Sequence, residues 1–182
     1  MNKISEKMNG QEMSMIKDKG NVADSFTEKA MWYIKKFANE ADYIAGKHYE
    51  ITPVFGNGLL NEGINELLTL ACSSSGTKFD TTNAYLGVGD SATAFDAAQT
   101  GLQAVTNKTY KAMDSGYPTY GTDQKVTFKS TFTGSDANFD WNEFTVANGN
   151  SDSSKNLNRK VSAEGTKASG QIWELTLEIS VA

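Results

Sequence analysis

The last twelve residues, 171–182, constrain the fold more than any other part of the chain. From residue 173 to residue 181 apolar residues alternate strictly with polar ones, and the apolar set is Trp173, Leu175, Leu177, Ile179 and Val181. Successive side chains of a β-strand point to opposite faces, so this segment has one apolar face and one wet face. The pattern predicts a half-buried antiparallel strand. No reactive group accompanies it.

The chain beyond residue 76 has the turn-rich pattern of a β-protein. Alternating segments at 125–133 and 139–146 flank a Gly-Ser-Asp turn and predict one hairpin. Segments 157–163 and 172–181 predict a second. We therefore expect a mainly β protein, an antiparallel β-sandwich-like domain with an N-terminal helical arm and one packed helix.

Segment 139–146 changes parity within its own length. Phe139 and Trp141 share one parity, whereas Phe144 and Val146 share the other. A β-bulge near residues 142–143 would explain the change, and so would burial of both faces. The sequence leaves these two alternatives open.

The N-terminal part is predicted to be separate from the sheet. Ser25 and Glu28 have the spacing of a capping box, and a helical stripe follows at Phe26, Ala30, Tyr33, Ile34, Phe37 and Ala41. The pattern predicts a helix over 24–43 that packs on the protein's own body or docks on a neighbouring subunit. Residues 1–20, with four of the six methionines, have little periodicity. We expect residues 1–45 to form an arm and residues 46–182 the β-rich domain.

A second helix is predicted over residues 58–72, within the β-rich domain. Its apolar positions are Leu60, Ile64, Leu67, Leu68 and Ala71, and Asn57 is the candidate N-cap. Such a stripe predicts that Ile64, Leu67 and Leu68 pack on the sheet.

The chain has few histidine and cysteine residues that could serve in catalysis, disulfide formation or metal binding. His48 is the only histidine and Cys72 the only cysteine, so the chain can form neither an internal disulfide nor a zinc site of the His/Cys type. We expect His48 to lie on the surface or on an edge strand. We expect Cys72, at the end of an apolar helix, to be a small buried hydrophobe.

Other patterns that resemble functional motifs are incomplete. Residues 136–140 imitate the opening of a calcium loop, but Trp141 stands where the loop needs Gly and Ala147 where it needs Glu. We expect a turn of hydrogen-bonding Asp and Asn residues instead. Glu62 and Glu66 share a helix face and are expected to be solvated. No catalytic, cofactor-binding or metal-binding residue is predicted, and we expect no enzyme.

Charge and hydropathy exclude several classes of partner. The formal net charge is −5 and the chain has no basic stripe, so neither nucleic acid nor an anionic membrane surface is an expected partner. No apolar run approaches the roughly 18 residues that a membrane helix needs. The polar start at residues 1–3 predicts no signal peptide, which is consistent with synthesis in a cytoplasm.

An ordered series of short segments carries a family resemblance. The segments are 58–68 (GLLNEGINELL), 84–91 (AYLGVGDS), 100–103 (TGLQ), 111–118 (KAMDSGYP), 137–144 (ANFDWNEF), 157–161 (LNRKV), 165–167 (GTK) and the Trp173 strand. In this order they resemble a group of tailed-bacteriophage virion structural proteins. The resemblance covers about residues 54–182 and implies a β-sandwich-like module in a phage head or tail, with no catalytic residues.

The resemblance implies other virion proteins as partners, either major capsid or tail proteins, and a homo-oligomer. Because a negative surface suits the outside of a DNA-filled shell, we expect a decoration, cement or fibre-base protein on the capsid exterior. The alternative is a tail or tail-fibre component whose loops, such as 110–120, contact the host surface. An enzyme, such as a virion-associated hydrolase, is the third possibility.

Four of the matching residues have expected structural roles. Trp141 and Trp173 are large apolar anchors whose indole N–H needs a partner if it is buried. Arg159 lies between two apolar residues, and Glu143 is its candidate partner across the sheet.

Overall fold

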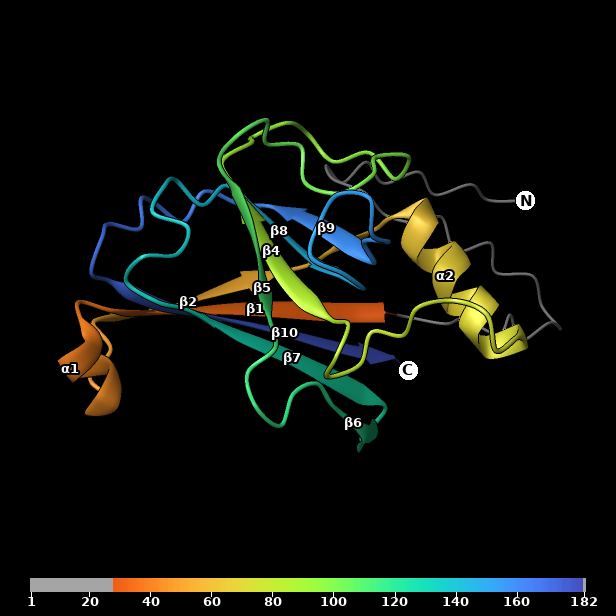
Figure 1. Cartoon of the computed structure of the whole chain (residues 1–182), viewed down its shortest axis with the longest axis horizontal. Coiled ribbons are helices and arrows are strands. Elements are labelled where there is room, and N and C mark those ends of the chain that lie inside the picture. The colour runs from red at the N-terminus through yellow and green to blue at the C-terminus, as the bar shows by residue number, and fades with distance from the viewer. Residues whose placement is uncertain (1–27, 182) are drawn as a thin grey trace, which may run out of the picture.

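The structure is a computed structural model that describes residues 28–181, and it contains two five-stranded antiparallel sheets (Figure 1). The first sheet has the order β2-β1-β10-β7-β6, with bounds β1 Glu28–Phe37, β2 Glu50–Phe55, β6 Thr119–Thr122, β7 Lys125–Phe132 and β10 Ile172–Val181. The second has the order β3-β9-β8-β4-β5, with bounds β3 Gly58–Leu59, β4 Tyr85–Gly89, β5 Lys108–Ala112, β8 Glu143–Ala147 and β9 Asn158–Val161. Helices α1 (Glu40–Ile44) and α2 (Asn61–Cys72) lie at opposite ends of the molecule. The fold is therefore mainly β and sandwich-like, as the sequence predicts.

Strand β10 is the predicted C-terminal strand, and it lies in the middle of the first sheet. Leu175 and Leu177 are fully buried, whereas the alternate residues Thr176 and Glu178 are partly exposed. The strand pairs with β1 on one side and with β7 on the other. This half-buried antiparallel strand confirms the alternation in the sequence.

The predicted helix over 24–43 is wrong for residues 28–37. These residues form β1, which pairs with β10 from Glu28↔Val181 to Phe37↔Ile172. Trp32 and Ile34 are fully buried in the core. The segment carries both periods, and pairing with β10 over its full length decides for the strand. A helix, α1, begins only after Asn39, whose side chain accepts a hydrogen bond from the Asp42 N–H at 2.9 Å.

The predicted boundary at residue 45, between an arm and the β-rich domain, does not hold for residues 28–37. It lies between β2 and β10, so residues 28–37 are an interior part of the sheet and not an arm. The remainder of the predicted arm and helix, residues 1–27, lies outside the described residues.

Both predicted hairpins are wrong, although their strands exist. Strands β7 and β8 follow each other in the chain but belong to different sheets, and so do β9 and β10. Instead, β8 pairs with β9, and β7 pairs with β6 and β10. Alternation of apolar and polar residues indicates which face of a strand is buried, but it does not identify the strand that pairs with it. The strand β8 begins only at Glu143, so Phe139 and Trp141 precede it and the change of parity lies outside the strand. All five residues of β8 itself are buried.

The core between the two sheets is rich in aromatic side chains. Trp32 of the first sheet meets Phe144 of the second with ring centroids 5.8 Å apart. Trp141 lies edge-on to Phe132 at 4.8 Å and to Trp173 at 4.9 Å, a geometry that aromatic pairs prefer. Within residues 28–181 the Trp141 indole donates to the Ala137 carbonyl at 3.0 Å, while the Trp173 indole N–H has no partner.

Candidate binding surface at helix α2

Helix α2 is attached to the sandwich through its first turn. Its N-cap is Leu60, which is fully buried, and not the predicted Asn57. The Leu60 N–H donates to the Leu157 carbonyl at 3.0 Å. Gly63 is the buried residue of the helix, and a Cβ there would meet the Leu157 Cα at 2.3 Å. The helix backbone therefore rests directly on the chain just before β9.

Two glutamates fasten the polar edge of α2 to the same body. An Oε1 atom of Glu62 accepts the Asn156 N–H at 3.0 Å. The Oε1 atom of Glu66 accepts the Thr77 N–H at 2.6 Å and the Asn148 side-chain amide at 3.2 Å. The prediction that this pair is merely solvated is wrong, because both carboxylates anchor neighbouring loops.

The apolar stripe of α2 is largely exposed to solvent beyond Leu60. Ile64, Leu67 and Leu68 are 37%, 44% and 59% exposed, so the prediction that they pack on the sheet is wrong. The reason lies in tertiary contacts: Gly63 allows the closest approach to Leu157, and Glu62 and Glu66 bind the loops on the polar edge of the helix. An apolar helix face that is solvent-exposed in this way is typical of an interaction site.

A groove of about 450 Å³ adjoins the exposed stripe of α2. It lies at the end of the sandwich, and its lining includes Leu67, Phe79, Tyr120, Val126, Ile179 and Val181. Tyr120 is 73% exposed at its rim. We call the groove together with Ile64, Leu67 and Leu68 the α2 surface. It has the apolar character that binding sites for protein segments commonly have.

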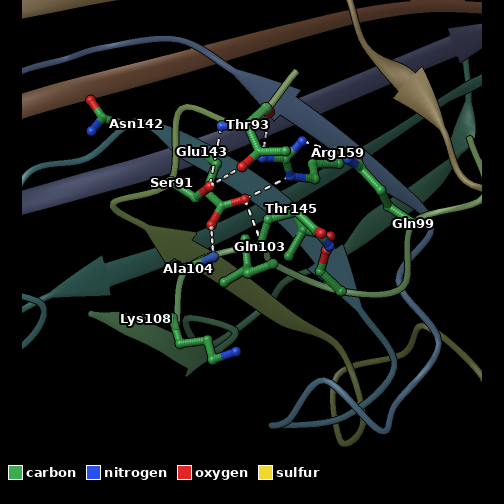
Figure 2. A network of polar contacts seen from close by, with 12 residues as sticks. Ser91, Thr93, Gln99, Gln103, Ala104, Lys108, Asn142, Glu143, Thr145 and Arg159 are labelled. Carbon is green, nitrogen blue, oxygen red and sulfur yellow. Dashed lines mark hydrogen bonds and ion pairs between the residues drawn. The ribbon is translucent and has the colours of Figure 1, made fainter. Parts of the chain in front are cut away.

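A buried ion pair on the second sheet is the other concentration of polar groups (Figure 2). Arg159 of β9 donates from Nε to Oε2 of Glu143 on β8 at 2.6 Å, as the sequence predicts. The same carboxylate accepts the backbone N–H groups of Gln103 at 2.9 Å and Ala104 at 2.7 Å. The other nitrogens of the Arg159 guanidinium reach the Gln99 side chain and the Thr93 carbonyl.

This network fastens the 90–107 loop over the outer face of the second sheet. Leu102 and Ala104 of that loop are buried, and a Cβ on Gly89 would meet Oε1 of Glu143 at 2.5 Å. The Glu143 and Arg159 side chains are fully buried and already partnered. A carboxylate that is closed from solvent and occupied by three donors has a structural role, not that of an acid or base.

The segment that imitates a calcium loop is a hydrogen-bonded turn, as predicted. Asp136 accepts from Lys111 Nζ at 2.6 Å and from the Thr133 N–H at 2.8 Å. Burial works against ionisation, but the hydrogen bonds from Lys111 and Thr133 lower the pKa of Asp136. The ammonium group of Lys167 donates a hydrogen bond to Asn138 Oδ1 in the same turn, at 2.9 Å.

Lys167 lies at the centre of this turn. Its Nζ donates to the carbonyls of Thr133 at 2.7 Å and Asp136 at 2.9 Å, besides Asn138, and the side chain is fully buried. Burial lowers the pKa of Lys167 to about 8. Because all three ammonium donors are used, the lysine ties the turn together.

The two residues with the most reactive side chains are isolated. His48 is exposed just before β2 and stands edge-on to Phe37 at 6.2 Å. Cys72 is exposed at the end of α2, so the prediction of a buried cysteine is wrong. Its helix turns the apolar side outward, and Cys72 follows that side into solvent.

Only part of the 110–120 region is available for contact. The Tyr110 hydroxyl donates to Asp152 Oδ1 at 2.7 Å. Burial is the main cause that raises the pKa of Tyr110 above its ordinary value, and this hydrogen bond is the second. Tyr120, on β6, is the exposed tyrosine of the pair.

Residues 28–181 contain no group of three or more His, Cys, Asp or Glu side chains placed to hold a metal ion. In the same part of the chain, neither helix has the length and apolarity needed to cross a bilayer.

Comparisons with protein-family models, with curated proteins and with solved structures found no match to this chain.

Proposed function

We propose that this protein is a non-enzymatic structural component of a tailed-phage virion and that it binds other virion subunits through the α2 surface. The observation that carries the proposal is the outward-facing stripe Ile64, Leu67 and Leu68 beside an apolar groove. Burying such a face on a partner removes apolar area from water, worth roughly 25 cal/mol per Å².

The use of the polar residues supports a binding role over a catalytic one. Glu62, Glu66, Glu143 and Asp136 each accept hydrogen bonds that hold one segment of the fold to another. Carboxylates spent in this way are not free to act as an acid–base pair. The resemblance in the sequence adds the phage context.

The capsid exterior is the favoured place, as a decoration, cement or fibre-base protein. The formal charge of −5 supports a position away from packaged DNA. The alternative, a tail or tail-fibre component that contacts the host, has the exposed Tyr120 in its favour. Labelling the protein on intact particles separates the two, because a lattice of sites over the shell differs from sites on the tail axis alone.

The test is the binding of purified protein to particles that lack it. Saturable binding with a stoichiometry set by particle symmetry is expected, with no turnover of peptidoglycan or polysaccharide. Leu67→Asp should abolish binding, whereas Asn65→Asp, which adds the same charge to an exposed position outside the apolar stripe, should preserve it. Hydrolysis that disappears on changing one carboxylate, with particle binding intact, would refute the proposal.

A further inference from the structure

The α2 surface lies where the described chain begins. The first residue of β1, Glu28, pairs with Val181 at the end of β10. Val181 and Ile179 also line the groove. The 27 residues that precede Glu28 therefore enter the fold beside the groove.

The core-facing residues of β1 lie on the same side of the first sheet as two residues of the groove. Ala30 and Trp32 face the core, and Glu28 has the same parity. Ala30 pairs with Ile179 and Glu28 with Val181, and both of these partners line the groove.

The composition of residues 1–27 suits an irregular apolar surface. Its apolar members are Met1, Ile4, Met8, Met13, Met15, Ile16, Val22 and Phe26. Methionine side chains are unbranched and polarizable, so they adapt to grooves that a rigid side chain fits poorly. The segment has four lysines and four acidic residues, so its own net charge does not repel it from an acidic body.

The length of residues 1–27 and their attachment to the same chain favour this segment over a second copy of the protein as the occupant of the α2 surface. Helix α2 has 12 residues and is about 18 Å long. A segment of 27 residues reaches up to about 90 Å when extended, so it can pass from Glu28 across the whole helix. An attached segment also acts at an effective concentration near the millimolar range, above that of a second copy in dilute solution.

We propose that residues 1–27 bind the α2 surface of their own chain, across the groove beside Val181 and the exposed residues Leu67 and Leu68. In the free protein this segment shields the apolar stripe from water. A further consequence rests on the proposed function: docking on a particle through the α2 surface requires the segment to be displaced.

The experiment uses the position of Cys72, the only cysteine, which is exposed at the end of α2. A nitroxide attached there broadens the amide NMR signals of nearby residues in the free, full-length protein. We expect loss of signal within residues 1–27 relative to the reduced label. This loss should disappear in Leu67→Asp or in the more exposed Leu68→Asp, and should persist in Asn65→Asp.

Mixed samples separate binding within one chain from exchange between copies. If isotope-labelled protein without nitroxide is mixed with unlabelled protein that carries it, residues 1–27 should keep their signals. Broadening of residues 1–27 in the mixed sample would overturn the proposal in favour of exchange between copies. Absence of broadening in residues 1–27, or an equal response of Leu67→Asp and Asn65→Asp, would overturn it as well.

The NMR experiment tests the binding of residues 1–27 separately from the proposed virion function, because its samples contain no virus particles. Failure to bind particles would leave the proposal standing and refute only the proposed function. If both hold, removal of residues 1–27 should raise the affinity for particles that lack the protein.

Discussion

Arg159 and Glu143 form a fully buried ion pair between neighbouring strands, with Arg159 Nε 2.6 Å from Glu143 Oε2. Glu143 stands opposite Val161 on β9, so Arg159 reaches it from two residues away on the same face. The carboxylate also holds the N–H groups of Gln103 and Ala104. A single pair thus joins β8, β9 and the 90–107 loop.

Removing one member of this pair should be costly. Arg159→Met leaves a buried carboxylate without its cation, and we expect a loss of about 3–5 kcal/mol in the free energy of unfolding. The double variant Glu143→Gln with Arg159→Met should lose less than the sum of the two single changes. Urea unfolding of the four proteins gives the coupling. Additive losses would show that the pair does not act as a unit.

Gly63→Ala should destabilise the protein although it improves helix propensity. Alanine favours a helix by about 1 kcal/mol over glycine. Here the new Cβ would meet the Leu157 Cα at 2.3 Å and the Asn156 carbonyl oxygen at 2.6 Å. Overpacking against backbone costs about 1–3 kcal/mol, so the clash outweighs the propensity. Thermal unfolding should show a lower midpoint, while Asn65→Ala, on the exposed side of α2, should leave it unchanged or slightly raised.

Two leucines of the same stripe should respond differently to truncation. Leu60 is fully buried at the N-cap of α2, and Leu60→Ala should cost about 2–5 kcal/mol. Leu68 is 59% exposed, and in the chain that lacks residues 1–27 Leu68→Ala should fall within about 0.5 kcal/mol of that shortened parent. Denaturant midpoints measure both. A large cost at Leu68 in the shortened chain would mean that the folded body itself covers the apolar face of α2.

Deletions should locate the true start of the folded body. Removal of residues 1–45 deletes β1 with Trp32 and Ile34, which are fully buried, and should abolish cooperative unfolding. Removal of residues 1–27 keeps β1 and should preserve the sheet. Far-ultraviolet circular dichroism and thermal melts compare the two chains. A folded product of the longer deletion would contradict the central position of β1.

Acid should weaken the turn at Asp136. Its folded-state pKa lies below the ordinary value of 3.8, so its contribution to stability is complete above that value and is lost as the pH falls through the folded-state pKa. The stability difference between the parent and Asp136→Asn should therefore be constant near neutrality and shrink below pH 3.8. Urea unfolding across this range measures it. A difference independent of pH would show that the carboxylate charge is not used.

Several local features could be predicted from the sequence because their cause is local. Strand β10 follows from strict alternation at residues 173–181, and the existence of α2 from its apolar spacing. The pairing of Glu143 with Arg159 could be predicted because Leu157 and Val161, two positions to either side of Arg159, are apolar. A charged side chain that is buried in such a segment needs a partner. The turn at 136–140 follows from the hydrogen-bonding habits of Asp and Asn.

Tertiary structure alone decided which elements are neighbours. Residues 28–37 carry both a helical and a strand period, and pairing with β10 selects the strand. Consecutive strands such as β7 and β8 divide between the two sheets because each buries its apolar face against the opposite sheet. The outward face of α2 follows from Gly63 against Leu157, a contact between segments far apart in the sequence. The sequence by itself determined where apolar faces exist, whereas long-range packing determined which of them are buried and left the α2 surface exposed.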